Sequence, residues 1–275
     1  MGLIKDFFFV SSRNEVPGLC LSGGGALGFA HIGVLQALED HGIFVNHIAG
    51  TSMGAIVGTL YAAGYAPAEM LQMIKDDKLY KITKLMTFRP ILLKSGLSNH
   101  SMLRSLIKEL IPHNSFDHLK KRMHICVVNL TKAEWEIVSE GEELDKWVAA
   151  SASIPGVFEA IMHNDTYYVD GGLLNNLPAQ GVEDFCQTII GVDVIPHIVP
   201  TELNKPTDTL ISSIRAMQHQ NSREGRELCR FLIEPKCIEK HHEFSFESFQ
   251  DIYQSGYSAT TKYIAENPEI MYLKK

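Results

Sequence analysis

The feature that most constrains the fold is a pattern that occurs twice in the first third of the sequence: an apolar strand, a glycine-bearing turn and a helix. Gly18–Ser22 is the first predicted strand, and residues 26–41 place apolar side chains at helical spacing. Asn46–Gly50 is the second predicted strand, and a helix is predicted over residues 54–63. Strands that alternate with helices predict a parallel sheet with helices on its faces. Because ligands of such sheets bind at the carboxyl ends of the strands, both turns are expected to face one site.

The rest of the chain continues this plan. Further helices are predicted over 67–77, 101–111, 144–150, 207–227 and 249–266, and further strands over 123–129, 134–139, 167–170, 188–194 and 230–233. We therefore expect an α/β fold of three layers, α/β/α, with a mainly parallel central sheet. We expect a single domain over residues 1–275, with a motif-bearing core over about 17–194, a helical insertion or lid over about 67–120 and a helical C-terminal part over 195–275.

Composition narrows the class of protein. The chain has 275 residues, of which 45% are hydrophobic and 21% charged, which is typical of a globular enzyme and excludes a disordered chain. A net charge of −7 argues against nucleic acid as a partner. Five scattered cysteines indicate a reducing, cytoplasmic environment, and no export signal is expected because the apolar run over 7–10 is too short. The late cysteines and histidines fit no common zinc pattern, so no metal is expected: Cys229, Cys237, His241 and His242.

Two stretches raise the question of a membrane. Residues 48–68 carry no Asp, Glu, Lys or Arg, but glycines interrupt them, so a buried strand and helix explain them better than a membrane span. Residues 78–94 hold five cations and no acid, interleaved with apolar residues. This segment is either a lid or membrane-surface contact that attracts anionic lipid, or a helical insertion that buries its apolar face. We favour the insertion, because helical spacing alone produces the same pattern.

A candidate nucleophile follows the second strand. Gly50-Thr51-Ser52-Met53-Gly54 matches G-x-S-x-G between a predicted strand and a predicted helix. In this context a sharp turn exposes the serine hydroxyl, and small flanking residues relieve crowding. The helix N-terminus adds unpaired N–H groups and a positive dipole end. Ser52 could instead be a helix N-cap without catalysis, but the flanking glycines favour the nucleophile.

The glycine-rich loop after the first strand offers an oxyanion hole. In Gly23-Gly24-Gly25 the backbone N–H groups can converge on a small anion without interference from Cβ atoms. Residues 23–28 also match the dinucleotide fingerprint G-x-G-x-x-G. That fingerprint requires an acidic residue at the end of the second strand, where this chain has Ala49-Gly50-Thr51-Ser52. A dinucleotide-binding oxidoreductase is therefore the less favoured alternative, and no cofactor is expected.

Asp170 is the candidate base. It ends a predicted strand and precedes Gly171-Gly172, so the backbone can turn sharply and approach another loop. An ordinary Asp-Gly turn would look the same, and the turn signal alone does not separate these two interpretations. None of the late histidines lies in a loop of small residues typical of a catalytic histidine. The side chains of Asn175 and Asn176 are expected to bond to the backbone of this turn.

Taken together, these motifs resemble the patatin-like phospholipases. The glycine loop, the elbow and Asp170-Gly171-Gly172 occur in the family's order, and Ala150–Phe158 is similar to the family's segment before its aspartate. The resemblance covers about residues 17–194. It implies a Ser52–Asp170 dyad without a histidine, a backbone oxyanion hole at Gly23–Gly25, and an acyl-enzyme formed from a lipid acyl ester and then hydrolysed.

The chain departs from the family pattern at Leu27, where the family usually has Arg or Lys. The resemblance then implies a weaker positive field near the loop and favours a neutral ester or a lysophospholipid over an anionic phospholipid. We expect a cytoplasmic lipid acyl hydrolase whose partner is a lipid or other acyl-ester substrate, with residues 78–94 as the candidate membrane contact. The alternative is a catalytically weak lipid- or acyl-binding relative.

Overall fold

The computed structural model describes residues 16–76, 100–195, 204, 206–235, 241 and 245–275. Eight strands of this described part form one sheet: β1 Gly18–Leu21, β2 His47–Gly50, β3 Arg122–Asn129, β4 Glu134–Val138, β5 Ile161–His163, β6 Thr166–Asp170, β7 Ile189–Val192 and β8 Phe231–Ile233. Their order is β5-β6-β3-β2-β1-β7-β8, with β4 also paired to β3. The strands β3, β2, β1, β7 and β8 are parallel, whereas β4, β5 and β6 run antiparallel to their neighbours.

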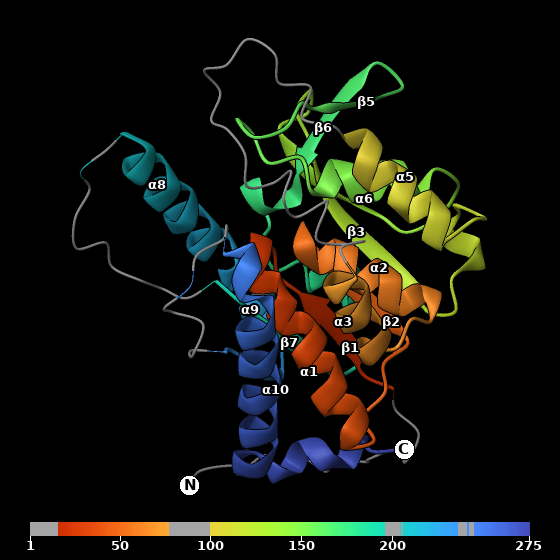
Figure 1. Ribbon diagram of the computed structural model, residues 1–275, viewed down its shortest axis with the longest axis vertical. Coiled ribbons are helices and arrows are strands. Elements are labelled where there is room, and N and C mark those ends of the chain that lie inside the picture. Colours follow the sequence, from red (N-terminus) through yellow and green to blue (C-terminus); the bar gives the residue numbers. More distant parts are fainter. Residues whose placement is uncertain (1–15, 77–99, 196–203, 205, 236–240, 242–244) are drawn as a thin grey trace, which may run out of the picture.

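Helices cover both faces of this sheet (Figure 1). They are α1 Phe29–Asp40, α2 Met53–Ala63, α3 Pro67–Lys75, α5 His100–Leu110, α6 Leu144–Ser151, α7 Gln180–Glu183, α8 Pro206–Asn221, α9 Arg223–Leu228 and α10 Phe249–Glu266. Gly58 of α2 lies against Ile48, whereas Gly181 of α7 lies against Ala49. Because successive residues of a strand point to opposite faces, α2 and α7 cover opposite sides of the sheet, which makes three layers.

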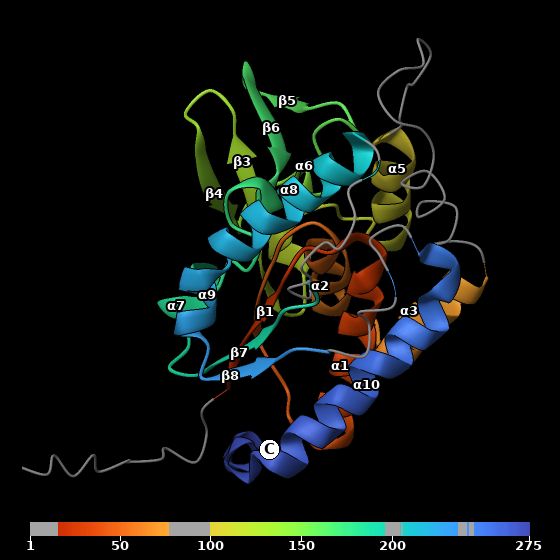
Figure 2. The ribbon, with the colours of Figure 1, turned by 90° about the vertical axis from the view of Figure 1, so that its left-hand side faces the viewer.

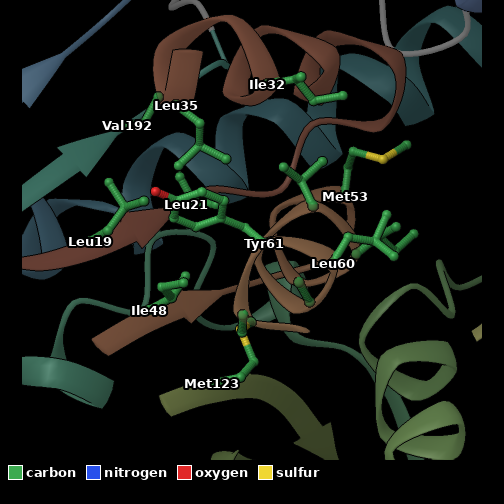
Figure 3. Close-up of a cluster of buried hydrophobic side chains, with 14 of the residues drawn as sticks. Leu19, Leu21, Ile32, Leu35, Ile48, Met53, Leu60, Tyr61, Met123 and Val192 are labelled. Carbon is green, nitrogen blue, oxygen red and sulfur yellow. The ribbon is translucent and has the colours of Figure 1, made fainter. Parts of the chain in front are cut away.

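The main core lies between the sheet and the first two helices. Figure 3 shows side chains of β1, β2, β3 and β7 meeting those of α1 and α2. Leu21, Ile48 and Leu60 are each at most 1% exposed. On the outer side of α1, helix α10 runs alongside (Figures 1 and 2). A Cβ added to Gly33 of α1 would lie 2.0 Å from the backbone oxygen of Tyr253, so this close helix contact requires glycine.

The strand β3 joins the parallel and antiparallel parts of the sheet. Ile125 pairs with Gly50 of β2 and also with β4, so β2 and β4 occupy opposite edges of β3. Two residues further on, Val127 pairs with Asp170 of β6 and also with β4. Therefore β6 lies on the same edge of β3 as β2. Since β6 runs antiparallel to β3 and β2 runs parallel to it, the carboxyl ends of β2 and β6 face each other.

The structure confirms the predicted α/β class with a mainly parallel sheet. The short elements β5 and α7 were not predicted, and the long helix predicted over 207–227 is two helices, α8 and α9, separated at Ser222. The segment 78–94 lies outside the described residues. Within the described ranges, each helix is too short or too polar to cross a bilayer.

Candidate active site

Ser52 lies in the turn between β2 and α2. Its backbone angles are φ 53° and ψ −121°, a conformation that non-glycine residues rarely adopt. The turn is tight because a Cβ on Gly54 would lie 2.4 Å from the Leu21 oxygen, and a Cβ on Gly50 would lie 2.6 Å from the Gly54 oxygen. Strained backbone of this kind occurs where a site holds a side chain in a fixed orientation.

Three neighbouring segments hold this turn in place. The Ser52 N–H donates to Ser151 Oγ at 2.9 Å, and Ser151 Oγ donates to the Cys126 oxygen of β3 at 2.7 Å. The Thr51 hydroxyl donates to the Asn175 oxygen at 3.0 Å. The turn that carries Ser52 is thus tied to α6, to β3 and to the loop that follows Asp170.

Asp170 ends β6 and lies beside Ser52. Its N–H donates to the Ser153 oxygen at 3.1 Å, and one carboxylate oxygen accepts the Gly172 N–H at 2.8 Å. The Ser52 side chain also hydrogen-bonds to this carboxylate. Burial raises the pKa of Asp170 to about 7, although the hydrogen bonds from Ser52 and Gly172 act in the lowering direction. A carboxylate with a pKa near neutrality is suited to accept and return a proton at neutral pH.

The glycine-rich loop lies directly against the nucleophile, since a Cβ on Gly23 would come 3.3 Å from Ser52 Cβ. The Gly23 N–H, however, donates to the Asn176 oxygen at 3.1 Å. No hydrogen bond joins the Gly24 or Gly25 N–H to another residue of the described chain. Of the three amides predicted to bind an oxyanion, Gly23–Gly25, those of Gly24 and Gly25 therefore remain available to an anion.

Two residues that follow this loop are structural. Leu27 is completely buried in the main hydrophobic cluster, so a cation at this position would enter the core. His31 is also completely buried, and its Nε2 lies 2.8 Å from the Ser22 oxygen. Burial lowers the pKa of His31 to about 4, so the ring is neutral and donates this hydrogen bond. It supports the strand end before the glycine loop.

Comparison with known proteins places the chain. The family model described as patatin-like phospholipase matches residues 19–182. The chain belongs to the patatin-like phospholipase family. It is 34% identical over 197 residues to lysophospholipase NTE1 of Candida glabrata, a match that covers 69% of this chain and 11% of the relative. It is 30% identical over 191 residues to an uncharacterised NTE family protein of Mycobacterium bovis, covering 67% of this chain and 31% of that protein.

These matches leave most of each relative uncovered: this patatin-like chain spans less than a third of either one's length. Among solved structures, the crystal structure of VipD from Legionella pneumophila superimposes with a TM-score of 0.50. That match covers 92% of this chain and 67% of VipD at 16% sequence identity, so it shows a common fold alone.

The structure also corrects the prediction for Asn175 and Asn176, whose side chains were expected to bond to the backbone. The Asn175 side chain donates to Gln180 instead, and the Asn176 side chain has no partner among the described residues. The turn is held by Asn221 of α8, whose Nδ2 donates to the Gly172 oxygen at 3.1 Å. The sequence did not predict this role of Asn221, because a single asparagine in a helical run gives no signal for it. The role of Ser151 was not predicted either, although Ser151 lies in Ala150–Phe158, the segment that resembles the patatin-like phospholipases.

Proposed function

We propose that this chain is a lipid acyl hydrolase that cleaves a carboxylic ester, with Ser52 as nucleophile and Asp170 as proton acceptor. The observation that carries the proposal is the hydrogen bond between the Ser52 side chain and a buried Asp170 whose pKa is about 7. Family membership supports a lipid ester as the substrate. The name of the Candida glabrata relative supports a lysophospholipid within that class.

In the first half of the reaction, Ser52 Oγ attacks the ester carbonyl and its proton passes to Asp170. The tetrahedral oxyanion accepts hydrogen bonds from the Gly24 and Gly25 amides, and one such donor is typically worth about 2.7–4 kcal/mol in the transition state. When the intermediate collapses, Asp170 gives the proton to the leaving alcohol. The acyl group then remains on Ser52 as an ester.

In the second half, water attacks the acyl carbonyl and loses a proton to Asp170. The new tetrahedral intermediate expels Ser52 Oγ, which takes the proton back from Asp170, and the fatty acid leaves. A histidine is not required in this scheme, because burial already brings the pKa of Asp170 close to the pH at which it must work.

The proposal is tested by labelling with a fluorophosphonate and by turnover of lysophosphatidylcholine. We expect one phosphonyl adduct on Ser52, located by peptide mass spectrometry and absent in Ser52→Ala. Ser105 is exposed on α5, so Ser105→Ala is the matched control and should label as the wild type does. Absence of labelling and of turnover at every pH from 6 to 9 would favour the non-catalytic lipid-binding alternative.

A further inference from the structure

Polar side-chain atoms from three parts of the chain surround Gly172. A Cβ placed on this glycine would lie 2.7 Å from Asn176 Oδ1, 3.1 Å from Asp170 Oδ1 and 3.1 Å from Gln218 Nε2. Gln218 belongs to α8, whose C-terminal half contacts the turn Gly171–Leu173 (Figure 2). Because Gly172 has no side chain, polar groups border the space beside the Asp170 carboxylate.

Asn176 is the unusual member of this group. It is 1% exposed, yet neither atom of its amide has a hydrogen-bond partner among the described residues. Leaving a buried polar group unpaired is costly in free energy. Its backbone is nevertheless fixed, because its N–H donates to Asn221 Oδ1 at 2.9 Å and its oxygen accepts the Gly23 N–H at 3.1 Å. A rigidly held, buried and unpaired amide indicates a group that receives its partner during the reaction.

The amide is also close to the nucleophile. A Cβ placed on Gly23 would lie 2.5 Å from Asn176 Oδ1 and 3.3 Å from Ser52 Cβ. Asn176 therefore contacts both the loop beside Ser52 and the turn beside Asp170. A small molecule bound by Asn176 would lie between the serine that carries the acyl group and the carboxylate that accepts protons.

The chemistry of the three groups selects the molecule. The oxygens of Asp170 and Asn176 can each accept a hydrogen bond, and the Gln218 Nε2 can donate one. Water matches this set: it donates to both oxygens, accepts from the nitrogen and retains one lone pair. We propose that Asn176 and Gln218 hold the water that hydrolyses the acyl group on Ser52, an inference that rests on the function proposed above.

The hydrolysis step conserves atoms and protons. The free lone pair of the water forms a bond to the acyl carbonyl carbon, and the proton directed at Asp170 passes to that carboxylate. Collapse of the tetrahedral intermediate breaks the bond to Ser52 Oγ, which takes the proton from Asp170. The products are the carboxylic acid and unmodified enzyme. Asn176 and Gln218 act when water is the attacking group, so formation of the acyl-enzyme does not need them.

The test separates the two halves of the reaction with p-nitrophenyl butyrate. In Asn176→Ala and Gln218→Ala we expect an unchanged pre-steady-state burst of p-nitrophenolate, because acylation of Ser52 is intact. Steady-state release should fall by about 10-fold to 10²-fold, the range expected when a reactant is poorly positioned. Intact-protein mass spectrometry should then show butyryl-Ser52 accumulating in both variants.

Gln220→Ala is the matched control, because Gln220 is exposed on the same helix two residues from Gln218. It should match the wild type in burst and in steady state. Equal losses of burst rate and steady-state rate in both variants would show a structural role and overturn the inference, as would unchanged kinetics in both. If the wild-type protein itself neither labels nor turns over, the proposed function fails instead. Because Gln218 is only partly buried, its variant is informative even where Asn176→Ala does not fold.

Discussion

The parallel and antiparallel parts of the sheet contribute different halves of the candidate active site. The parallel strands β1 and β2 lead into the glycine loop and Ser52, whereas the antiparallel strand β6 delivers Asp170. The two parts meet along one edge of β3, where Gly50 pairs with Ile125 and Asp170 pairs with Val127. The comparison shows that the proposed dyad depends on strand register: a slip of β6 by one residue would turn Asp170 to the opposite face of the sheet.

The largest expected effect tests whether the two parts act as one catalytic unit. We expect Ser52→Ala and Asp170→Asn each to lower kcat/KM for lysophosphatidylcholine by about 10⁴-fold or more, as for members of other catalytic units. Because both act in the same step, the double variant should lose no more than the worse single variant. Steady-state hydrolysis, with circular dichroism as the check on folding, measures this. Losses that multiply in the double variant would show that the two residues act independently.

The strands of the parallel part were predictable from sequence, whereas the antiparallel part was predicted only in part: β4 and β6 were expected as strands and β5 was not. The strands β1 and β2 are short apolar runs ended by glycines, and their predicted limits agree with the structure to within about a residue. The strand β5 has three residues and α7 has four, too few for any periodicity to show. The position of β6 in the sheet is set by a partner distant in sequence, as in the pairing of Tyr168 with Asn129 of β3.

The same contrast applies to the candidate site. Ser52 and the Gly23–Gly25 loop carry local motifs, and Asp170 was selected from its turn and from the family resemblance. The contact between Ser52 and Asp170 follows from the long-range pairing of β6 with β3, which no local pattern encodes. Likewise, the Gly23 N–H is occupied because the carbonyl of Asn176, far away in the sequence, lies against it.

Leu27 tests whether the glycine loop belongs to the core or to the substrate site. Since Leu27 is completely buried, Leu27→Arg places an unpaired charge in the core and should lower the free energy of unfolding by about 3–5 kcal/mol. Leu27→Met keeps volume and polarity and should cost less than about 1.5 kcal/mol. Urea titration measures both. A fully stable Leu27→Arg with increased activity on anionic lipids would instead place this side chain at the substrate.

The pH dependence of activity reports on the antiparallel part, because the proposed mechanism requires Asp170 to be ionised before it accepts a proton. With its pKa at about 7, kcat/KM should be low below pH 6, rise through neutrality and level off above pH 8. The same rise should occur for neutral and zwitterionic esters, since it belongs to the free enzyme. A profile that is flat between pH 6 and pH 8 would show that the group accepting the proton has a different pKa.

The stability of Asp170→Asn tests the same raised pKa of Asp170. As the pH rises, the activity of the wild type should increase, whereas its stability should decrease. Because folding raises the pKa of Asp170 from 3.8 to about 7, the folded state binds a proton that the unfolded state has released. The wild type should therefore lose stability as the pH rises through this interval, by on the order of 1.4 kcal/mol for each pH unit. Asp170→Asn removes this penalty, so it should gain stability relative to the wild type between pH 5 and pH 8. Urea unfolding of both proteins at pH 5 and pH 8 measures the sign of this stability difference. A gain in stability seen at pH 5 alone would contradict the prediction.

The smallest expected effect compares two serines at the end of α6: Ser151, which holds the Ser52 turn, and Ser153, which holds Asp170. The Ser151 side chain bridges the Ser52 N–H and the Cys126 oxygen, so Ser151→Ala removes a hydrogen bond from each of these two buried groups. We expect a loss of about 1–3 kcal/mol in the free energy of unfolding, with a several-fold lower rate of phosphonylation at Ser52. Ser153 supports Asp170 through its backbone oxygen, which Ser153→Ala retains. This matched variant loses a side-chain bond to Ala149 but should label at the wild-type rate. If Ser153→Ala slows labelling as much as Ser151→Ala does, the nucleophile turn is not held by the Ser151 hydroxyl in particular, and general loosening of the end of α6 explains both.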